Sequence, residues 1–233
     1  FYDLVVEIAI IRPGPIVGQM VHPYLNRRAG REPVTYAHPS LEPILERTLG
    51  VPLFQEQLLR IAMIAGGFTP GEAEELRRAL GFKRSEARMK EIELKLRQGL
   101  QRTGITGQAA ETIIRHITSF ALYGFPESHS ASFALLAYAS AYIKVHYPAA
   151  FYASLLNNQP MGFYHPATLV KDAQRRSQRI KPIDVLRSNW PCTLEEDGSV
   201  RLGLMYVAGL RKEQGKRIEQ ERRQKPFLSI DEL

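Results

Sequence analysis

The stretch Tyr123–Phe151, YGFPESHSASFALLAYASAYIKVHYPAAF, joins a turn, a helix start and a long apolar helix without interruption. Glycine and proline at residues 123–126 end the preceding helical pattern, because glycine tolerates positive φ and proline restricts its neighbour. Ser128 is the predicted N-cap. Apolar side chains then surround Phe133–Ile143 almost completely, which predicts a helix that is buried on most faces and ends at Pro148. The free N–H groups at the start of this helix favour an anion or a sugar hydroxyl.

The charge balance of the chain favours a polyanionic partner. The 233 residues carry 31 Lys and Arg against 24 Asp and Glu, a net charge of +7, and their hydrophobic content of 44% is ample for a core. The single cysteine, Cys192, excludes an internal disulfide and indicates a reducing compartment, which we expect to be the cytoplasm. No signal peptide or transmembrane run is recognisable, so no membrane partner is expected. Because the chain begins with Phe1, we expect it to be part of a longer protein.

Helical spacing dominates the rest of the chain and predicts a mainly α fold with a small β element. A capping box at Thr69–Glu72 starts one helix, and the alternating charges of 85–102 indicate an exposed connecting rod. A short strand is expected at 180–185, and Asp197-Gly198 predicts a β-hairpin within Cys192–Leu204. Helices are expected at 39–49, 54–65, 69–81, 85–102, 108–122, 149–156, 167–179 and 211–223.

Two arginines lie near the end of the predicted helix 69–81. Guanidinium forks match phosphate oxygens bidentately, so Arg77 and Arg78, followed by Lys83, form a candidate triphosphate site. Arg78 stands four residues after Glu74 and can instead pair within its own helix, whereas Ala73 occupies that position relative to Arg77. A solvated helix C-terminus, which favours cations, is the alternative interpretation.

Other polar residues are weaker candidates. Arg12 lies at the mouth of a stiff Arg-Pro-Gly-Pro corner, and Gln55 opens a predicted helix from which it can reach a base, sugar or phosphate. From the residues alone, an ordinary turn with a solvated Arg12 and a solvated glutamine on a helix are the favoured interpretations. Arg27 and Arg28 lie in a basic stretch suited to contact with a phosphate backbone.

The segment before the last predicted helix resembles a helix-hairpin-helix element, in which backbone N–H groups approach DNA phosphates. Its hairpin is Val207–Leu210, and a structural turn between two helices is the alternative. The residues expected to contact DNA are Gly209, Arg211, Lys212 and Lys216.

Several catalytic signatures are absent from the sequence. It contains no HExxH, P-loop, GxSxG or GxGxxG motif, and its aspartates are isolated, with no DxD pair. Neither a zinc site nor a two-metal phosphoryl-transfer site is therefore expected within this chain.

Four motifs in the right order resemble the alpha subunit of bacterial DNA polymerase III, the C family of DNA polymerases, and most closely its error-prone paralogue. They are RPGP at Arg12–Pro15, FQEQ at Phe54–Gln57, GEAEELRRALG at Gly71–Gly81, and YGFPESHSASFAL followed by IKVHYPAAF in the stretch quoted first. The resemblance covers most of the chain. It implies a fingers region at 1–160, and a connecting helix, β element and helix-hairpin-helix region at 161–233.

The resemblance also implies roles for individual residues. In the family the arginine pair faces the phosphates of the incoming nucleotide, which carries over to Arg77 and Arg78. The YGFxxSH-like stretch lies over the nucleotide and its sugar, and it corresponds here to Tyr123, Gly124, Phe125, Ser128 and His129. Phe133 replaces a frequent tyrosine, so a role for that hydroxyl does not carry over.

The partners implied by the resemblance are a DNA primer-template, an incoming dNTP, and other replication or mutasome proteins bound through regions outside this chain. The catalytic aspartates and their Mg²⁺ belong to the palm, upstream of Phe1, so the isolated chain is expected not to polymerise DNA. A DNA-binding module without a nucleotide site remains an alternative, as does a structure-specific nuclease or ligase. The intact arginine pair argues against the module, and the lack of an acid cluster or nucleophilic lysine motif argues against the nuclease or ligase.

Overall fold

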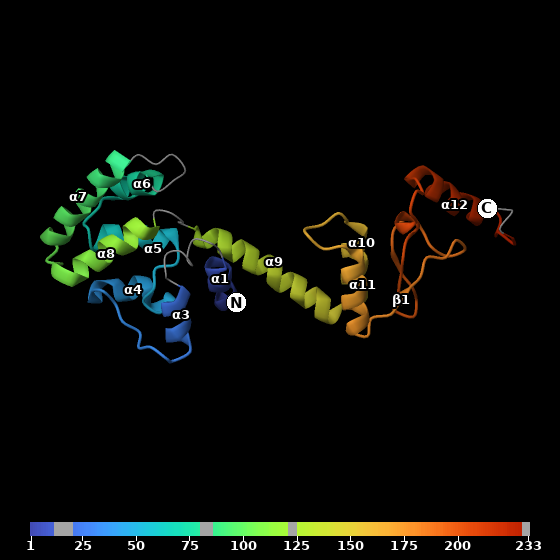
Figure 1. Ribbon diagram of the computed structural model, residues 1–233, viewed down its shortest axis with the longest axis horizontal. Helices are drawn as coiled ribbons and strands as arrows, with labels where there is room; N and C mark the ends of the chain where they lie inside the picture. Colours follow the sequence, from blue (N-terminus) through green and yellow to red (C-terminus); the bar gives the residue numbers. More distant parts are fainter. Residues whose placement is uncertain (12–20, 80–85, 121–124, 230–233) are drawn as a thin grey trace. The chain divides into compact units, whose positions relative to one another are not determined.

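The computed structural model describes residues 1–11, 21–79, 86–120 and 125–229, and the chain divides into two compact units, unit 1 (residues 1–136) and unit 2 (residues 137–233) (Figure 1). The division falls inside helix α9, Glu127–His146. The expected boundary at residue 160 concerns function rather than compactness, and it stays a prediction. The mainly α fold with a small β element is confirmed. Among the described residues, no helix combines the length and apolar character needed to cross a membrane.

Unit 1 is built around α5, Gln55–Ile64. Phe54, Leu58 and Ile61 are fully buried, and α5 contacts α4, α6 and α8. The apolar spacing of α5 therefore places its buried face in the core of unit 1. The other helices within the described residues of this unit, besides the start of α9, are α1 (Tyr2–Ile10), α3 (Val21–Arg28), α4 (Glu42–Leu45), α6 (Pro70–Ala79), α7 (Glu86–Arg102) and α8 (Gly107–Phe120).

Helix α6 begins as its sequence predicts. The Thr69 hydroxyl accepts a hydrogen bond from the Glu72 N–H at 3.3 Å, and the Glu72 carboxylate accepts one from the Thr69 N–H at 2.7 Å. Pro70 occupies the first helical position. The predicted capping box is therefore confirmed, because each of its bonds depends only on residues three apart in the chain. The predicted stop at Gly81 lies outside the described residues.

The expected helix at 39–49 is interrupted. It consists of α4 flanked by two short 3-10 turns, η1 (Pro39–Leu41) and η2 (Glu46–Thr48). Gly50, which follows it, has φ of 79°, and a Cβ there would lie 2.3 Å from the Thr35 carbonyl oxygen. Glycine is therefore required at this position, both for the backbone angle and for the close approach of the segment containing Thr35.

Helix α7 is not the exposed rod that its charges indicated. Leu96 and Leu100 are buried, α7 packs on α8, and a Cβ at Gly99 would lie 1.8 Å from the carbonyl oxygen of Gly66. Where the side chains of α7 are described, its charges lie on the outer face of an amphipathic helix. The prediction was wrong because it weighed the charge pattern over the leucine spacing.

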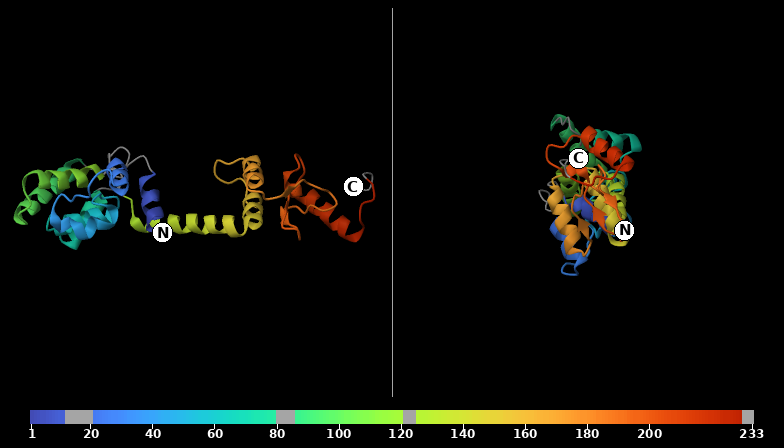
Figure 2. Two further views of the ribbon diagram at one scale, coloured as in Figure 1. Left: turned by 90° about the horizontal axis from the view of Figure 1, so that it is seen from below. Right: turned by 90° about the vertical axis from the view of Figure 1, so that its right-hand side faces the viewer.

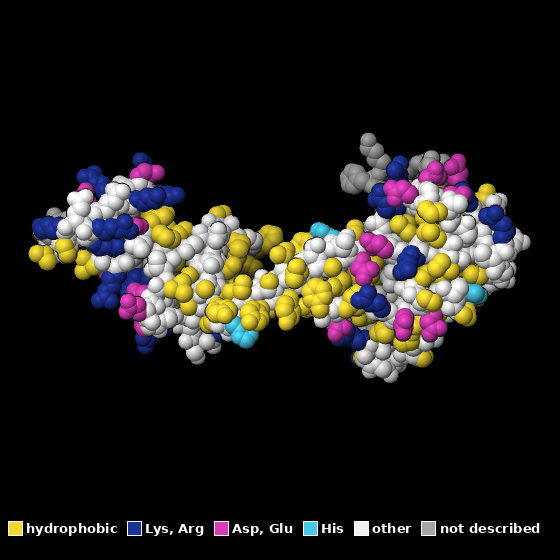
Figure 3. All heavy atoms as spheres, turned by 180° about the vertical axis from the view of Figure 1, so that it is seen from behind, with side chains coloured by type: hydrophobic (Ala, Val, Ile, Leu, Met, Phe, Trp, Pro, Cys, Tyr) yellow, Lys and Arg dark blue, Asp and Glu magenta, His cyan; other side chains and the backbone are white. Residues whose placement is uncertain are grey.

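Helix α9 is largely exposed, which contradicts its expected burial. Only Ser130 and Ala134 are buried along it, whereas Leu135, Leu136 and Val145 are at least 60% exposed. Apolar side chains gather over this helix (Figure 3). An apolar sequence indicates a surface that avoids water, but it does not tell which part of a protein covers that surface.

Unit 2 combines helices with a three-stranded sheet of strand order β1-β3-β2. Strand β1 pairs parallel with β3, and β2 pairs antiparallel with β3. The hairpin predicted at Asp197-Gly198 is confirmed, with Gly198 at φ of 74°. The expected strand at 180–185 is reduced to β1. The elements are α10 (Pro148–Asn157), α11 (Pro166–Arg175), β1 (Ile180–Lys181), β2 (Thr193–Leu194), β3 (Val200–Arg201), η3 (Leu204–Tyr206) and α12 (Lys212–Gln224).

The Gly66–Gly99 approach yields a test of the unit 1 core. Gly99→Ala inserts a methyl group where the Gly66 backbone lies, so it is expected to destabilise this unit by about 1–3 kcal/mol. Hydrogen exchange measured by mass spectrometry on the full-length protein should be faster in α7 and α8. Gly71→Ala is the matched control, because its Cβ meets nothing within 4 Å on α6. Equal exchange in the two variants would contradict the close approach.

Candidate functional sites

The start of α5 and the start of α9 are bonded to each other. The Gln55 N–H donates to the Phe125 carbonyl oxygen at 3.0 Å, and the Glu127 N–H donates to Glu56 Oε2 at 2.9 Å. Phe54, directly before α5, is fully buried. The FQEQ motif and the described part of the YGFPESH motif, some 70 residues apart, are therefore held together, and two of the predicted site residues, Gln55 and Phe125, are adjacent.

The cap of α9 differs from the one predicted. The helix starts at Glu127, so Ser128 lies inside its first turn, and its carbonyl accepts from the Ser132 hydroxyl. The carboxylate of Glu56 takes the capping role instead. With Glu127 in the first turn as well, two carboxylates lie at this helix N-terminus. Their negative charge repels an anionic ligand at this helix start. Of the two ligands predicted there, an anion or a sugar hydroxyl, the sugar hydroxyl therefore suits the geometry better.

Three aromatic rings follow one another along the start of α9. The ring centroids of Phe125 and His129 are 4.9 Å apart, and those of His129 and Phe133 are 4.7 Å apart, both edge to face. His129 is exposed and Phe133 is 48% exposed. We call Phe125, His129 and Phe133 the aromatic row. It presents flat apolar surface, of the kind on which a sugar or base packs, beside the Gln55 backbone.

Several residues that the sequence analysis did not predict lie near the joint between the starts of α5 and α9. Helix α1 lies beside the start of α9 in two views (Figures 1 and 2). Burial and the neighbouring Glu127 carboxylate raise the pKa of Tyr2 to about 12, and the Arg47 guanidinium lies 3.7 Å from the Tyr2 ring centre. Ser130 is buried, and its hydroxyl has no partner among the described residues. Glu56 was the one residue a sequence signal could have found, since it lies inside the FQEQ motif.

Arg77 and Arg78 share one carboxylate. Glu74 accepts from Arg77 Nε at 2.8 Å and Nη2 at 2.6 Å, and from Arg78 Nε at 3.2 Å. Arg77 therefore does have a partner within its helix, three residues away, which the sequence analysis did not foresee. These bonds hold the pKa of Glu74 down to about 2. Both arginine side chains remain exposed, at 46% and 75%, so a ligand in solution can reach them.

The hairpin of α5 and α6 sets where the arginine pair lies. The two helices pack against each other and are joined by a short connection, residues 65–69. Helix α6 therefore folds back along α5, which brings its C-terminal turn, with Arg77 and Arg78, towards the end of α5 that carries Gln55.

Two other polar side chains near this corner serve the fold. Gln57 is buried, and its amide oxygen accepts from the N–H groups of Leu53 and Phe54 at 2.8 and 3.1 Å. The Arg27 guanidinium donates to the carbonyl oxygens of Leu49 and Thr35 at 2.7 and 3.1 Å, and its side chain is only 12% exposed. These bonds hold the Arg27 guanidinium against the backbone of its own unit, and its contact with a phosphate backbone stays a prediction.

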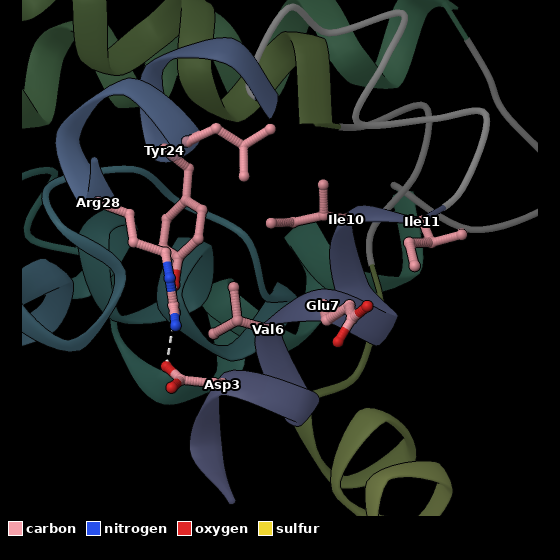
Figure 4. A pocket seen from close by; sticks show the side chains of 8 residues that line it. Asp3, Val6, Glu7, Ile10, Ile11, Tyr24 and Arg28 are labelled. Carbon is pink, nitrogen blue, oxygen red and sulfur yellow. Dashed lines mark hydrogen bonds and ion pairs between the residues drawn. The ribbon is translucent and has the colours of Figure 1, made fainter. Parts of the chain in front are cut away.

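Arg28 borders a pocket of about 530 Å³ between α1 and α3. Arg28 Nη1 lies 2.6 Å from Asp3 Oδ1 in an exposed ion pair, drawn as a dashed line in Figure 4. Val6, Ile10 and Tyr24 give the pocket an apolar wall. DNA contact by Arg28 stays a prediction, since an exposed ion pair of this kind exchanges readily.

The predicted hairpin of unit 2 forms a tight turn. The Leu210 N–H donates to the Val207 carbonyl oxygen at 3.2 Å, and Gly209 has φ of 79°, as the third position of such a turn requires. Within the described residues, the N–H groups of Ala208 and Gly209 have no hydrogen-bond partner. The turn leads directly into α12, at whose start the side chains of Arg211, Lys212 and Lys216 are exposed.

Four predicted site residues lie outside the described residues: Arg12, Lys83, Tyr123 and Gly124. Their roles stay predictions.

The class of protein follows from two family matches. Residues 1–104 match the family model of the bacterial DNA polymerase III alpha subunit finger domain, and residues 177–233 match that of a helix-hairpin-helix motif. The chain belongs to the family of bacterial DNA polymerase III alpha subunits, as its motifs indicated.

Its relatives narrow the comparison to the error-prone branch of this family. Three proteins named error-prone DNA polymerase match the whole of the chain. They come from Methylococcus capsulatus (51% identical over 255 residues), Pseudomonas aeruginosa (49% over 237) and Bordetella bronchiseptica (53% over 238). The chain spans about a quarter of each of them, 24%, 23% and 23%.

The hydrogen bond from the Glu127 N–H to the Glu56 carboxylate allows the capping of α9 to be tested. Glu56→Ala is expected to fray the start of α9 and to raise amide exchange over 127–131 about fivefold, since a cap contributes ~1 kcal/mol. Hydrogen exchange on the full-length protein measures this. Glu91→Ala removes an exposed carboxylate from α7 and should leave α9 unchanged. Identical exchange in both variants would show that Glu56 does not cap the helix.

Proposed function

We propose that this chain is the fingers part of a template-directed DNA polymerase of the error-prone kind, which copies damaged DNA. The observation that carries the proposal is the bonded joint between the FQEQ and YGFPESH motifs. It gathers Gln55 and the aromatic row into one corner, towards which α6 directs the arginine pair. The family membership and the names of the relatives support the same function.

In this proposal two groups of residues bind the incoming dNTP, one its triphosphate and the other its sugar and base. Arg77 and Arg78 bind the triphosphate, whose charge exceeds that of the Glu74 carboxylate they now share, so the exposed ion pairs are exchanged for phosphate. The sugar and base lie against His129 and Phe133, with Gln55 at the edge. The two carboxylates at the start of α9 keep the phosphates away from that end, which fixes the direction of the nucleotide.

The chemistry proposed is attack of a primer 3′-hydroxyl on the α-phosphate, with release of pyrophosphate. Arg77 and Arg78 orient the triphosphate and stabilise charge on the departing pyrophosphate. Among the described residues, no group of three His, Cys, Asp or Glu side chains is placed so that it could hold a metal ion. We propose that Mg²⁺ is held outside this chain and that the chain alone does not polymerise.

DNA binding is proposed for the hairpin and the start of α12. The N–H groups of Ala208 and Gly209 are free to donate to phosphate oxygens, and the cations of α12 follow directly. Such contacts do not depend on the base sequence. A polymerase must hold duplex DNA of any sequence, so contacts of this kind suit it.

Arg78→Ala in the full-length protein tests the nucleotide site. Loss of a charge-assisted hydrogen bond to phosphate should lower kcat/KM for dNTP about 30-fold, without changing the Kd for primer-template. Arg102→Ala, which removes an exposed arginine from the end of α7, is the matched control and should retain kcat/KM. Steady-state primer extension gives both values, and an unchanged kcat/KM in Arg78→Ala would remove this residue from the site.

Lys212→Ala tests the DNA contact separately. It should weaken duplex binding alike for all sequences and reduce the slope of log Kd against log salt by about 0.9, the value for one lost phosphate contact. Fluorescence anisotropy over a salt series measures the slope. Glu213→Ala removes the neighbouring charge of opposite sign and should not reduce the slope; equal slopes in Lys212→Ala and wild type would argue against contact.

A further inference from the structure

A second pocket lies wholly within unit 2, and none of the sites above uses it. It has a volume of about 550 Å³ and is bounded by the end of α9, by α10 and α11, and by residues of the connecting loop 158–165. We call it the α10–α11 pocket. Its wall combines three cations, Lys144, Lys171 and Arg175, with the apolar side chains of Phe151, Met161 and Tyr164.

One cation of the pocket is fixed and two are free. Lys144 Nζ lies 2.7 Å from Asp172 Oδ2, and the Tyr152 hydroxyl donates to the same oxygen at 2.7 Å. These two bonds hold the pKa of Asp172 down to about 2, so the carboxylate stays ionised and keeps Lys144 in place. Lys171 and Arg175 are exposed, and neither forms an ion pair with any residue in the described part of the chain.

The two free cations are arranged in a row. They stand four residues apart on α11, so they project from the same face about one helical turn, ~5.4 Å, from each other. The pocket thus holds three cations against one carboxylate, which makes it a site for an anion with at least two charged groups.

Exposed aromatic rings accompany these charges. Tyr164 lines the pocket and is 63% exposed, and the adjacent Phe163 is fully exposed. Gly162, with φ of 56°, turns the chain just before them. Adjacent exposed rings of this kind form an apolar patch, and such patches mark candidate contact surfaces for a ligand.

We propose that the α10–α11 pocket binds unpaired nucleotides of a DNA strand, with Tyr164 stacked on a base and with Lys171 and Arg175 on consecutive phosphates. Proteins bind single-stranded nucleic acid by stacking its bases on aromatic side chains and by placing cations along its phosphates. Duplex DNA needs only the charges, because its bases are already stacked. A protein segment would match the aromatic rings but leave two cations unpaired, and protein interface cores are depleted of lysine. This choice of strand rests on the proposed polymerase function, under which the unpaired DNA is the single-stranded part of the template.

The test uses the full-length protein and two primer-templates, one with a single unpaired template nucleotide and one with twelve. Wild type should bind the long overhang more tightly. Tyr164→Ala should weaken binding of the long overhang at least about fivefold and leave the short one unchanged, since stacking on an aromatic ring accounts for such a factor. Lys171→Gln should reduce the salt slope for the long overhang by about 0.7.

Matched controls are Tyr138→Ala and Arg187→Gln, which remove an exposed aromatic ring and an exposed cation of unit 2 outside the pocket; both should retain the overhang preference. Wild-type binding that is independent of overhang length, or a preference unchanged in Tyr164→Ala, would overturn the proposal. A lower melting temperature of Tyr164→Ala with equal losses on both substrates would show that this side chain stabilises the fold rather than stacks on a base, and would likewise overturn the proposal. Primer extension on the short overhang reports on the proposed polymerase function independently.

Discussion

Two hydrogen bonds between the start of α5 and the start of α9 are the constraint on which unit 1 depends. Helix starts leave backbone N–H groups without partners, and here each start supplies what the other lacks: Phe125 provides a carbonyl oxygen for Gln55, and Glu56 provides a carboxylate for Glu127. Because the opposite face of α5 packs into the core of unit 1, the start of α9 is tied to a helix of that core. The proposed nucleotide site lies at this joint, so the ends of two helices hold it in place.

The features that could be predicted from the sequence depend on neighbouring residues. The capping box of Thr69 and Glu72 and the hairpin turn at Asp197-Gly198 involve partners within a few positions, and both formed as expected. The cap of α9 was missed because its partner, Glu56, is 71 residues away, and a local rule selects the nearest hydroxyl, Ser128. The exposure of α9 was missed for a related reason, since its apolar composition does not specify what covers it.

Residue type alone could not separate functional from structural polar groups. Gln55 and Gln57 stand two positions apart in one motif, yet Gln57 points into the core and satisfies two backbone N–H groups, while the Gln55 side chain makes no hydrogen bond with a described residue. Likewise Arg27 is enclosed by the backbone of Leu49 and Thr35, which no periodicity reveals. For Arg77, the spacing of four residues was considered and that of three was not, although both reach the same carboxylate on a helix.

The distribution of carboxylates near the cations matches the two kinds of ligand proposed. Arg77 and Arg78 are exposed and share Glu74, so a triphosphate must displace a carboxylate to bind, which weakens its hold. A polymerase gains from this, because a nucleotide that does not match the template must leave quickly. Lys171, Arg175 and Lys212 have no carboxylate partner in the described part of the chain, so phosphates bind them without such competition. DNA that remains bound through successive additions is suited to those positions. Under the functions proposed, the pairing of each cation thus distinguishes groups that release their ligand in every cycle from groups that keep it.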